Sequence, residues 1–444
     1  MRVRFYAGGA PETTDRARGG KGSRHSRGGR DKSPPASTRG GIGLTWRGAT
    51  AISRNFGEIP EESTVPIATH PELNDAHAAL KELSNSFANS RLLPGAAERD
   101  RSGEFPDDIY REAAGHGLVG LNIPERFGGG GLGLTESALV LEELARVDGS
   151  FALTVGASAG LAAGHILRAG TEEQAARWLP LLTGGELGAW ALTEPGSGSD
   201  AAALRCRAER KGGSYTLNGS KMFISQGSLF SVMVLIARTG EGRGGISALA
   251  VEASDAGRES RPIPGKLGMR SMDTAEVVFE GCEIPAGRLL GGEGEGFSHV
   301  VDVLTEGRIS VGAIALGLGQ GALDAALDHS RSREAFGRSI ERFTGIREQL
   351  ADCAIALAAG RGLVYRAARY ADSGKDAGVL AAKAKLFSSE AALRVCDRSI
   401  QIHGGYGYID EYPAHRFWRD ARLLTIGEGT SEILRGFISR SEFK

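Results

Sequence analysis

The chain has few cysteines and no paired-cysteine motif. Only four of its 444 residues are cysteine, and Cys206, Cys282, Cys353 and Cys396 form no C-x-x-C pair and have no histidine at metal-ligand spacing. We therefore expect neither a disulfide framework nor a metal site, and we expect a reducing compartment, the cytoplasm or, in a eukaryote, the mitochondrial matrix. No uninterrupted run approaches the ~18 to 20 apolar residues that span a bilayer, so we expect no membrane segment.

The common phosphate-binding motifs are also absent. There is no G-x-x-x-x-G-K-[ST], and no G-x-G-x-x-G lies between a predicted strand and a predicted helix. P-loop and Rossmann enzymes are therefore disfavoured. Residues 317–321 (GLGQG) are a weak match within a helical pattern, and close helix packing through small residues explains them better. A nucleotide cofactor would have to bind on another scaffold.

The net charge of −1 conceals a basic N-terminal segment. Residues 1–55 carry 12 Lys or Arg and 3 Asp or Glu, with many glycines and no apolar periodicity. We expect residues 1–65 to be a disordered basic extension. A transit peptide, which should be amphipathic, and a nucleic-acid-binding arm are the alternatives to the interpretation we favour, a dispensable extension.

The remaining sequence changes its periodicity twice. Residues 66–187 repeat apolar side chains at helical spacing, as in 135–145, 150–167 and 171–182. Residues 188–295 contain short alternating runs between glycine-rich turns, which predict antiparallel strands at 203–209, 214–217, 232–237, 247–251 and 275–279. Residues 296–444 return to long amphipathic helices, at about 297–333, 344–372 and 376–403, as in an antiparallel bundle.

Three glycine-rich motifs are the candidates for chemistry. Residues 425–433 (TIGEGTSEI) set Glu428 between two glycines, just ahead of a helix-capping Thr-Ser pair, so its carboxylate can project from a tight turn. Residues 190–200 (WALTEPGSGSD) offer backbone N–H groups and hydroxyls that suit a flat heterocycle and nearby anions. Residues 401–408 read QIHGGYGY. Taken alone, a helix cap and glycine-rich loops explain these segments.

In their order and separations, the three motifs resemble those of the acyl-CoA dehydrogenase family, from about residue 70 to the C-terminus. The resemblance implies an α+β multidomain fold: an N-terminal all-α domain, a middle antiparallel β-barrel domain and a C-terminal four-helix bundle. It also implies FAD-dependent conversion of an acyl-CoA to a trans-2-enoyl-CoA. Glu428 would take the α-proton and the β-hydride would pass to flavin N5. Electrons would go to an electron-transfer flavoprotein, and the assembly would be a homotetramer, a dimer of dimers.

The resemblance also assigns binding residues, some of them across a subunit boundary. The FAD contacts it implies are Trp190, Leu192, Thr193, Ser199, Phe223, Ile224, Ser225, Arg333, Phe336, Thr344, Gln401, Gly404, Gly405, Thr430, Ser431 and Glu432. The substrate contacts it implies are Ser199, Thr305, Arg308 and Gly429. Three positions depart from the common pattern: Phe223 stands for a usual Trp, Ser225 for Thr, and Thr344 for Gln.

Two further positions bear on the base and the substrate. A minority of relatives place the base on the first bundle helix, just before an arginine; here that position is Gly307, and Glu306 is one step out of register. The residue before the catalytic glutamate is commonly Tyr and here is Gly427. Loss of that aromatic wall indicates a bulkier, branched or cyclic acyl group.

Two rival functions use the same fold. An acyl-CoA oxidase would reoxidise its flavin with O₂. A nucleic-acid-binding flavoprotein would have a basic bundle, but residues 296–444 carry 20 Lys or Arg against 18 Asp or Glu. We therefore expect no specific nucleic acid partner.

Overall fold

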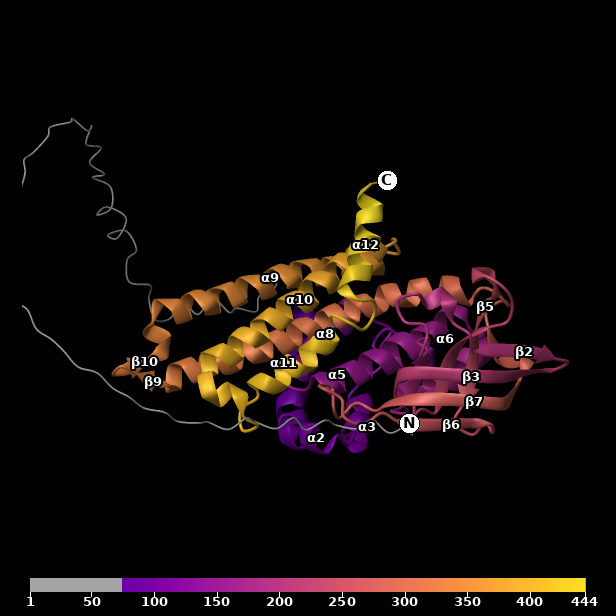
Figure 1. Ribbon diagram of the computed structural model, residues 1–444, viewed down its shortest axis with the longest axis horizontal. Coiled ribbons are helices and arrows are strands. Elements are labelled where there is room, and N and C mark those ends of the chain that lie inside the picture. Colours follow the sequence, from indigo (N-terminus) through magenta and orange to yellow (C-terminus); the bar gives the residue numbers. More distant parts are fainter. Residues whose placement is uncertain (1–73, 444) are drawn as a thin grey trace, which may run out of the picture. The chain divides into compact units, whose positions relative to one another are not determined.

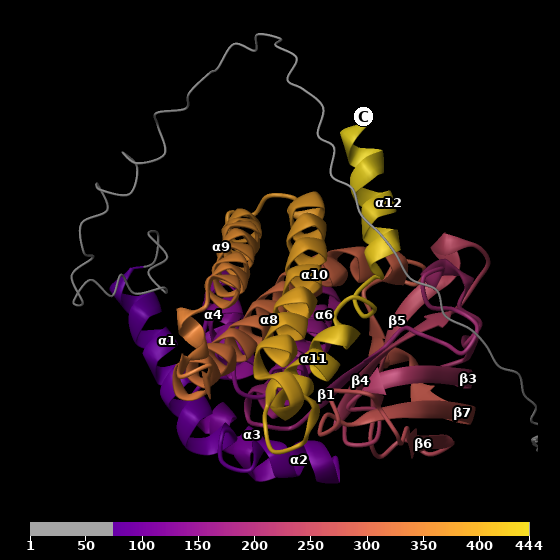
Figure 2. The same cartoon turned by 60° about the vertical axis from the view of Figure 1, so that its left-hand side comes forward.

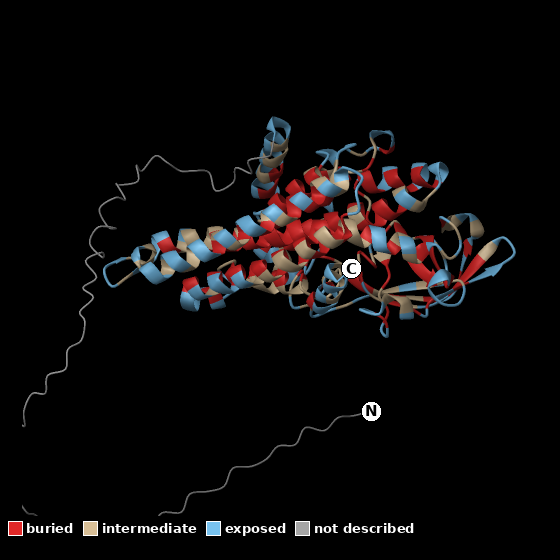
Figure 3. Cartoon of the chain, turned by 90° about the horizontal axis from the view of Figure 1, so that it is seen from above, coloured by how far each residue is buried: buried red, intermediate tan, exposed pale blue. Residues whose placement is uncertain are grey.

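The structure, a computed structural model, describes residues 74–443. The predicted basic extension, residues 1–65, lies outside the described residues. Figure 1 confirms the predicted order, in which helices come first, a sheet follows, and a helical bundle ends the chain. Buried residues gather where the long helices meet one another and where they meet the sheet (Figure 3).

Some of the first helices begin where the sequence offers a cap. Asn74 accepts the N–H of His77 at 2.9 Å, and Thr171 forms a capping box with Gln174. The helix expected at 150–167 is interrupted by a π-helix, η3, whose residues are small apart from Leu161. The elements are α1 (Asp75–Phe87), η1 (Ala88–Leu92), α2 (Ala96–Ser102), α3 (Asp107–Gly115), η2 (Glu125–Phe127), α4 (Leu134–Ala145), α5 (Gly149–Val155), η3 (Gly156–Ala162), α6 (Ala163–Ala169) and α7 (Glu172–Thr183).

The middle part is a mostly antiparallel sheet with the order β6-β7-β3-β2-β4-β5-β8. β1 pairs with β4 in parallel, and among the described strands β6 and β8 end the order rather than closing a cylinder. The strand expected at 203–209 begins later, because the Glu194 carboxylate accepts the N–H groups of Arg205 and Cys206. The strands are β1 (Gly188–Ala191), β2 (Arg207–Lys211), β3 (Ser214–Ser225), β4 (Val232–Arg238), β5 (Ile246–Glu252), β6 (Arg258–Pro262), β7 (Thr274–Pro285) and β8 (Leu289–Leu290).

Three long helices lie side by side in the C-terminal part (Figures 1 and 2): α8 (Gly296–Ser332), α9 (Thr344–Asp372) and α10 (Gly378–His403). A small hairpin, β9 (Glu334–Ala335) and β10 (Arg338–Ser339), joins α8 to α9 at one end of the bundle. The short helices α11 (Ala414–Leu423) and α12 (Ser431–Glu442) follow, and α12 projects away from the bundle in Figure 2.

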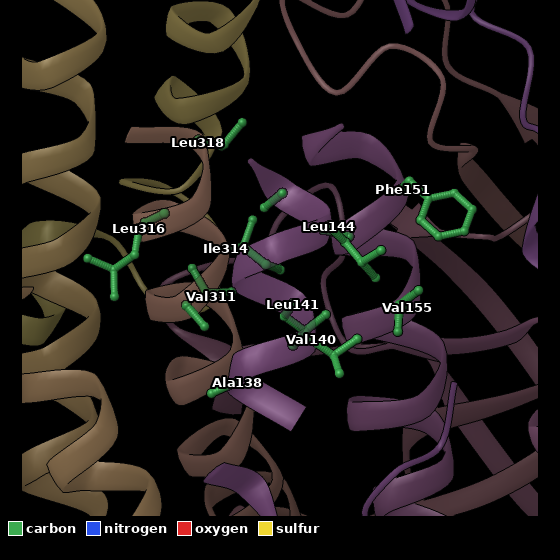
Figure 4. Close-up of a cluster of buried hydrophobic side chains, with 14 of the residues drawn as sticks. Ala138, Val140, Leu141, Leu144, Phe151, Val155, Val311, Ile314, Leu316 and Leu318 are labelled. Carbon is green, nitrogen blue, oxygen red and sulfur yellow. The ribbon is translucent and has the colours of Figure 1, made fainter. Parts of the chain in front are cut away.

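Helix α4 packs against the bundle and joins the first helices to it. Leu141 and Leu144 of α4 face Ile314 of α8 in the close-up of Figure 4. At the start of α4, the Asp372 carboxylate of α9 accepts the N–H and the hydroxyl of Thr135, at 3.0 and 2.6 Å. This carboxylate supplies the cap that the α4 sequence lacks.

Glycines in α8 allow its neighbours to approach at backbone contact, as the sequence predicts for residues 317–321. A Cβ on Gly317 would lie 2.2 Å from the Glu142 carbonyl oxygen, and one on Gly321 would lie 2.2 Å from the Arg146 carbonyl oxygen. Both carbonyls belong to the end of α4 and the residue that caps it.

Two helical stretches, Gly149–Ala169 and Gly296–Ser332, are long and apolar enough to cross a membrane by length and composition. Their most apolar windows are 78% and 89% buried within the fold. Glycine and alanine between larger apolar residues make the mean hydropathy of these stretches high. A search for uninterrupted apolar runs does not detect them. Burial of this extent is that of core helices in a bundle.

We predict that Gly321→Ala destabilises the protein by ~1 to 3 kcal/mol, the usual cost of overpacking a core, because the new methyl would meet the Arg146 carbonyl. Gly362→Ala is the matched control, since a Cβ on this exposed glycine of α9 has nothing within 4 Å. The control should gain up to ~1 kcal/mol from helix propensity. Urea unfolding measures both, and equal stability of the two variants would contradict the packing argument.

Candidate active site

Glu428 lies in the turn between α11 and α12, in a backbone conformation that is unusual for a side-chain-bearing residue. Its φ is +55°, and the φ of Gly429 is +96°. Left-handed backbone at a non-glycine residue costs on the order of 1 to 3 kcal/mol and persists only where the surroundings hold it.

Three contacts hold this turn. The Arg308 Nε of α8 donates to the Glu428 carbonyl at 3.4 Å, and the Lys385 Nζ of α10 donates to the Gly429 carbonyl at 2.7 Å. The Ser431 N–H closes the turn on the Thr425 carbonyl at 3.1 Å. Two cations from separate helices therefore bind two successive carbonyls.

Glu428 is partly exposed as a residue, but one oxygen of its carboxylate is enclosed. Its Oε2 is buried and has no hydrogen-bond partner among the described residues. Burial raises the pKa of Glu428, and the positive charges of Arg308 and Lys385 oppose that rise. The carboxylate is thus a stronger base than an exposed glutamate.

Gly307 of α8 leaves space directly beside this carboxylate. A Cβ on Gly307 would lie 2.8 Å from the Glu428 Oε2 and 2.8 Å from the Leu161 Cδ2 of η3. The position that carries the base in some relatives therefore faces the same space here. Glu306 has another partner: its carboxylate pairs with Arg168 of α6 and lies near Gly164.

A buried ion pair holds the loop after β1. The Lys221 Nζ, fully buried, donates to the Glu194 carboxylate at 2.8 Å and to the Leu192 carbonyl at 3.0 Å. The Met222 N–H donates to the Thr193 carbonyl at 2.8 Å, so the two predicted flavin segments lie together. Burial lowers the pKa of Lys221, with Glu194 opposing that effect.

The second segment ends in a bulge of β3. The β3–β7 register shifts between Lys221 and Ile224, and Phe223 there has a φ of +59°. The bulge leaves the Phe223 side chain 66% exposed while Ile224 is buried. Ser225 is half-buried at the end of the strand. Trp190 points to the helices, where its indole N–H donates to the His165 Nδ1 at 3.1 Å.

A second group of predicted cofactor residues lies at the C-terminal end of α8. Arg333 stacks over the Tyr406 ring at 5.5 Å and lines a cavity of about 400 Å³ with Gly404 and Gly405. Phe336, 95% exposed, lies at the tip of the β9–β10 hairpin. At ~1.5 Å per residue, the helix separates Arg308 from Arg333 by about 38 Å.

The other predicted residues are divided between the two ends. Thr344 and Gln401 are exposed, at the start of α9 and near the end of α10. Ser199 is exposed in its loop. The Thr305 hydroxyl bonds the Val301 carbonyl of its own helix at 3.1 Å.

The last of them are at the start of α12. Thr430 caps this helix, Ser431 is buried at its first position, and Glu432 is exposed in its first turn.

Sequence reasoning missed Lys385, Leu161 and the Lys221–Glu194 pair. A signal for Lys385 does exist, because it shares one face of α10 with the buried residues Ala381 and Ser388. A lysine on a buried helix face needs a partner. Among residues 74–443, no group of His, Cys, Asp or Glu is arranged to bind a metal.

Family models match almost all of the described chain. The N-terminal, middle and C-terminal domains of acyl-CoA dehydrogenase match residues 74–186, 189–282 and 294–443. An acyl-CoA dehydrogenase of Bacillus subtilis (strain 168) is 39% identical over 364 residues, 81% of this chain and 96% of the relative. The chain belongs to the acyl-CoA dehydrogenase family. The resemblance carried by the three sequence motifs is confirmed.

Solved structures show the same fold as this acyl-CoA dehydrogenase family member. A chain in a structure of the electron transferring flavoprotein of Acidaminococcus fermentans is 40% identical, with a TM-score of 0.83, covering 84% of this chain and 99% of that one. A glutaryl-CoA dehydrogenase from Mycobacterium smegmatis in complex with FADH2 is 28% identical, with a TM-score of 0.81, covering 84% and 96%.

Proposed function

We propose that this family member oxidises an acyl-CoA thioester to a trans-2-enoyl-CoA with FAD, and that Glu428 takes the α-proton. The observation that carries the proposal is the buried, unpaired Oε2 of Glu428 with its raised pKa. A general base works best when its pKa is close to the working pH, and enzymes raise the pKa of glutamates by burial for this purpose.

The residues present fit a flavin. Phe223 offers an exposed aromatic ring beside Leu192 and Thr193, and the Ser225 hydroxyl has no hydrogen-bond partner among the described residues. Arg333 at the far cavity pairs with no carboxylate in residues 74–443, as suits a phosphate ligand. When bound, the flavin supplies the acceptor for the β-hydride.

The chain itself contributes a base with one enclosed oxygen and a hydrogen-bond donor. The Leu161 side chain and the empty position at Gly307 keep polar groups away from the Glu428 Oε2, which receives the proton. The Glu428 N–H donates to no group among the described residues and is free to polarise the thioester carbonyl. A donor of this kind contributes ~3 to 4 kcal/mol in well-studied hydrolases.

We propose a homotetramer, built as a dimer of dimers, in which FAD bridges two chains. Arg308 contacts the Glu428 carbonyl, and Arg333 lies about 38 Å further along α8, so we propose that Arg333 and Glu428 of one chain serve different cofactors. Arg333, Phe336 and Gly404 would therefore contact the FAD of a neighbouring subunit. We further propose an electron-transfer flavoprotein as acceptor, as the relative from Acidaminococcus fermentans suggests.

The first test concerns the base. Glu428→Gln keeps the side-chain shape but cannot accept a proton. We expect FAD to stay bound and acyl-CoA still to perturb the flavin spectrum, while stopped-flow flavin reduction slows by at least ~10²- to 10⁴-fold.

Glu306→Gln is the control for this test. Its carboxylate is paired with Arg168 rather than turned to Glu428, so we expect less than about a tenfold change, equivalent to ~1.4 kcal/mol of barrier. Loss of reduction in Glu306→Gln but not in Glu428→Gln would move the base to α8.

The second test concerns the far cavity. Arg333→Ala should weaken FAD retention, because charge-assisted hydrogen bonds to phosphate are worth ~1.5 to 3 kcal/mol each. Arg331→Ala is the control, since Arg331 is exposed and pairs with Asp328 of its own helix at 3.5 Å. Flavin released on gel filtration measures retention, and equal retention in both variants would remove Arg333 from the site.

Gly427 bears on the acyl group. It does not have a left-handed φ, and a Cβ there would meet only the Leu423 carbonyl oxygen, at 3.9 Å. The backbone therefore does not require glycine at this position. We propose that the missing side chain leaves room for a bulkier, branched or cyclic acyl group.

The Gly427→Tyr variant should therefore fold normally. The ratio of kcat/KM for straight, short acyl chains to kcat/KM for branched ones should rise about tenfold or more. One extra or missing methylene in a pocket is worth ~1 to 3 kcal/mol. A panel of acyl-CoAs assayed with an electron-transfer flavoprotein measures this, with O₂ as sole acceptor testing the oxidase alternative. An unchanged preference would show that residue 427 does not line the acyl pocket.

A further inference from the structure

Lys385 is a buried cation to which the reaction as proposed assigns no role. It lies in the first third of α10, its side chain is fully buried, and its neighbours on the same helix face are small residues such as Ala381 and Ser388. Lysine is almost never fully buried without a partner. Its presence on this face therefore calls for a specific contact.

That contact is the turn which carries Glu428. The Lys385 Nζ donates to the Gly429 carbonyl at 2.7 Å, while Arg308 of α8 donates to the Glu428 carbonyl next to it. Both residues whose carbonyls are bound have a left-handed φ. Because a trans peptide is planar, fixing the Gly429 carbonyl also fixes the following N–H, that of Thr430, at the start of α12.

We propose that Lys385 is a positioning residue for the base: its ammonium holds the left-handed Glu428–Gly429 turn in place, and its charge keeps the buried carboxylate ionised before substrate binds. The catalytic half of this inference rests on the proposed function. The structural half does not depend on any reaction.

The charges around Lys385 and Glu428 are consistent with this role. Burial lowers the pKa of Lys385 to about 8, with Glu428 raising it and Arg308 lowering it further. Glu390 and Glu432 also face Lys385 and raise its pKa. Lys385 thus remains mostly charged at neutral pH. Its charge opposes the rise that burial gives to the pKa of Glu428, so removing it should raise that pKa further.

The experiment compares Lys385→Met with Lys385→Arg in the full-length, FAD-loaded protein. Lys383→Met is the matched control: it lies two residues earlier on α10, is partly exposed, and pairs with Glu442 of α12 at 2.5 Å. Lys385→Gln, neutral and polar, is the second variant if methionine is not tolerated.

Two readouts do not require turnover. Hydrogen exchange of a peptide spanning 425–431 should speed up at least tenfold in Lys385→Met and remain near wild type in Lys385→Arg and Lys383→Met. Infrared difference titration against Glu428→Gln should show Glu428 losing its proton at higher pH in Lys385→Met and Lys385→Gln. Wild-type exchange and an unchanged titration in these variants would overturn the proposal.

Turnover is the third readout. The rate should rise with pH as Glu428 ionises, so Lys385→Met should move the acid limb of kcat to higher pH and lower kcat about tenfold at neutral pH, with little change in KM. If Lys385→Met is only less stable, the acid limb of its kcat–pH profile will stay where it is in the wild type. That result would overturn the proposal that Lys385 keeps Glu428 ionised. If no acyl-CoA reduces the flavin of the wild-type protein, the proposed function fails. The exchange and titration results would still decide the role of Lys385.

Discussion

The close packing of α8 against its neighbours positions the two groups of site residues in the helical bundle, those around Glu428 and those around Arg333. Gly317 and Gly321 bring the helix onto the backbone at the end of α4, and Gly312 brings it to α9, where a Cβ would lie 2.9 Å from the Val364 Cγ2. Because close-packed interiors transmit strain, these contacts hold α8 in place. Gly307, a third of the way along the helix, lies against the Glu428 carboxylate, and Arg333, just after its C-terminal end, lines the far cavity.

Two loops that carry predicted site residues are each held by a buried lysine. Lys221 binds the Leu192 carbonyl in the sheet, and Lys385 binds the Gly429 carbonyl in the bundle. An ammonium has three donors and no fixed plane, so it can satisfy carbonyls in irregular backbone. The two sites differ in charge balance. Lys221 lies in direct contact with a carboxylate, whereas Lys385 contacts only a carbonyl and leaves its charge to act on Glu428.

The sequence predicted the helix–sheet–helix order, the packing role of residues 317–321 and a tight turn around Glu428, because each depends on local pattern. It started one strand too early, at residue 203, because the Glu194 carboxylate accepts the N–H groups of Arg205 and Cys206 through a contact that no local pattern predicts. Lys385 was missed for a related reason. Periodicity identifies the buried face of α10, but whether a lysine on it finds a carbonyl depends on a turn 44 residues away in the chain.

The predicted cofactor contacts fall into two groups that α8 keeps apart. Motifs in a single sequence do not predict this separation. The motifs treat Arg333 and Glu428 as parts of one site, yet Arg333 follows the C-terminal end of α8 while Glu428 lies beside Gly307, a third of the way along that helix. In the proposed tetramer, each flavin would then contact two chains and would bind the assembled form better than separate subunits. A ligand that binds one state preferentially stabilises that state by mass action. FAD binding and subunit association would therefore favour each other, and the rigidity of α8 would be what couples them.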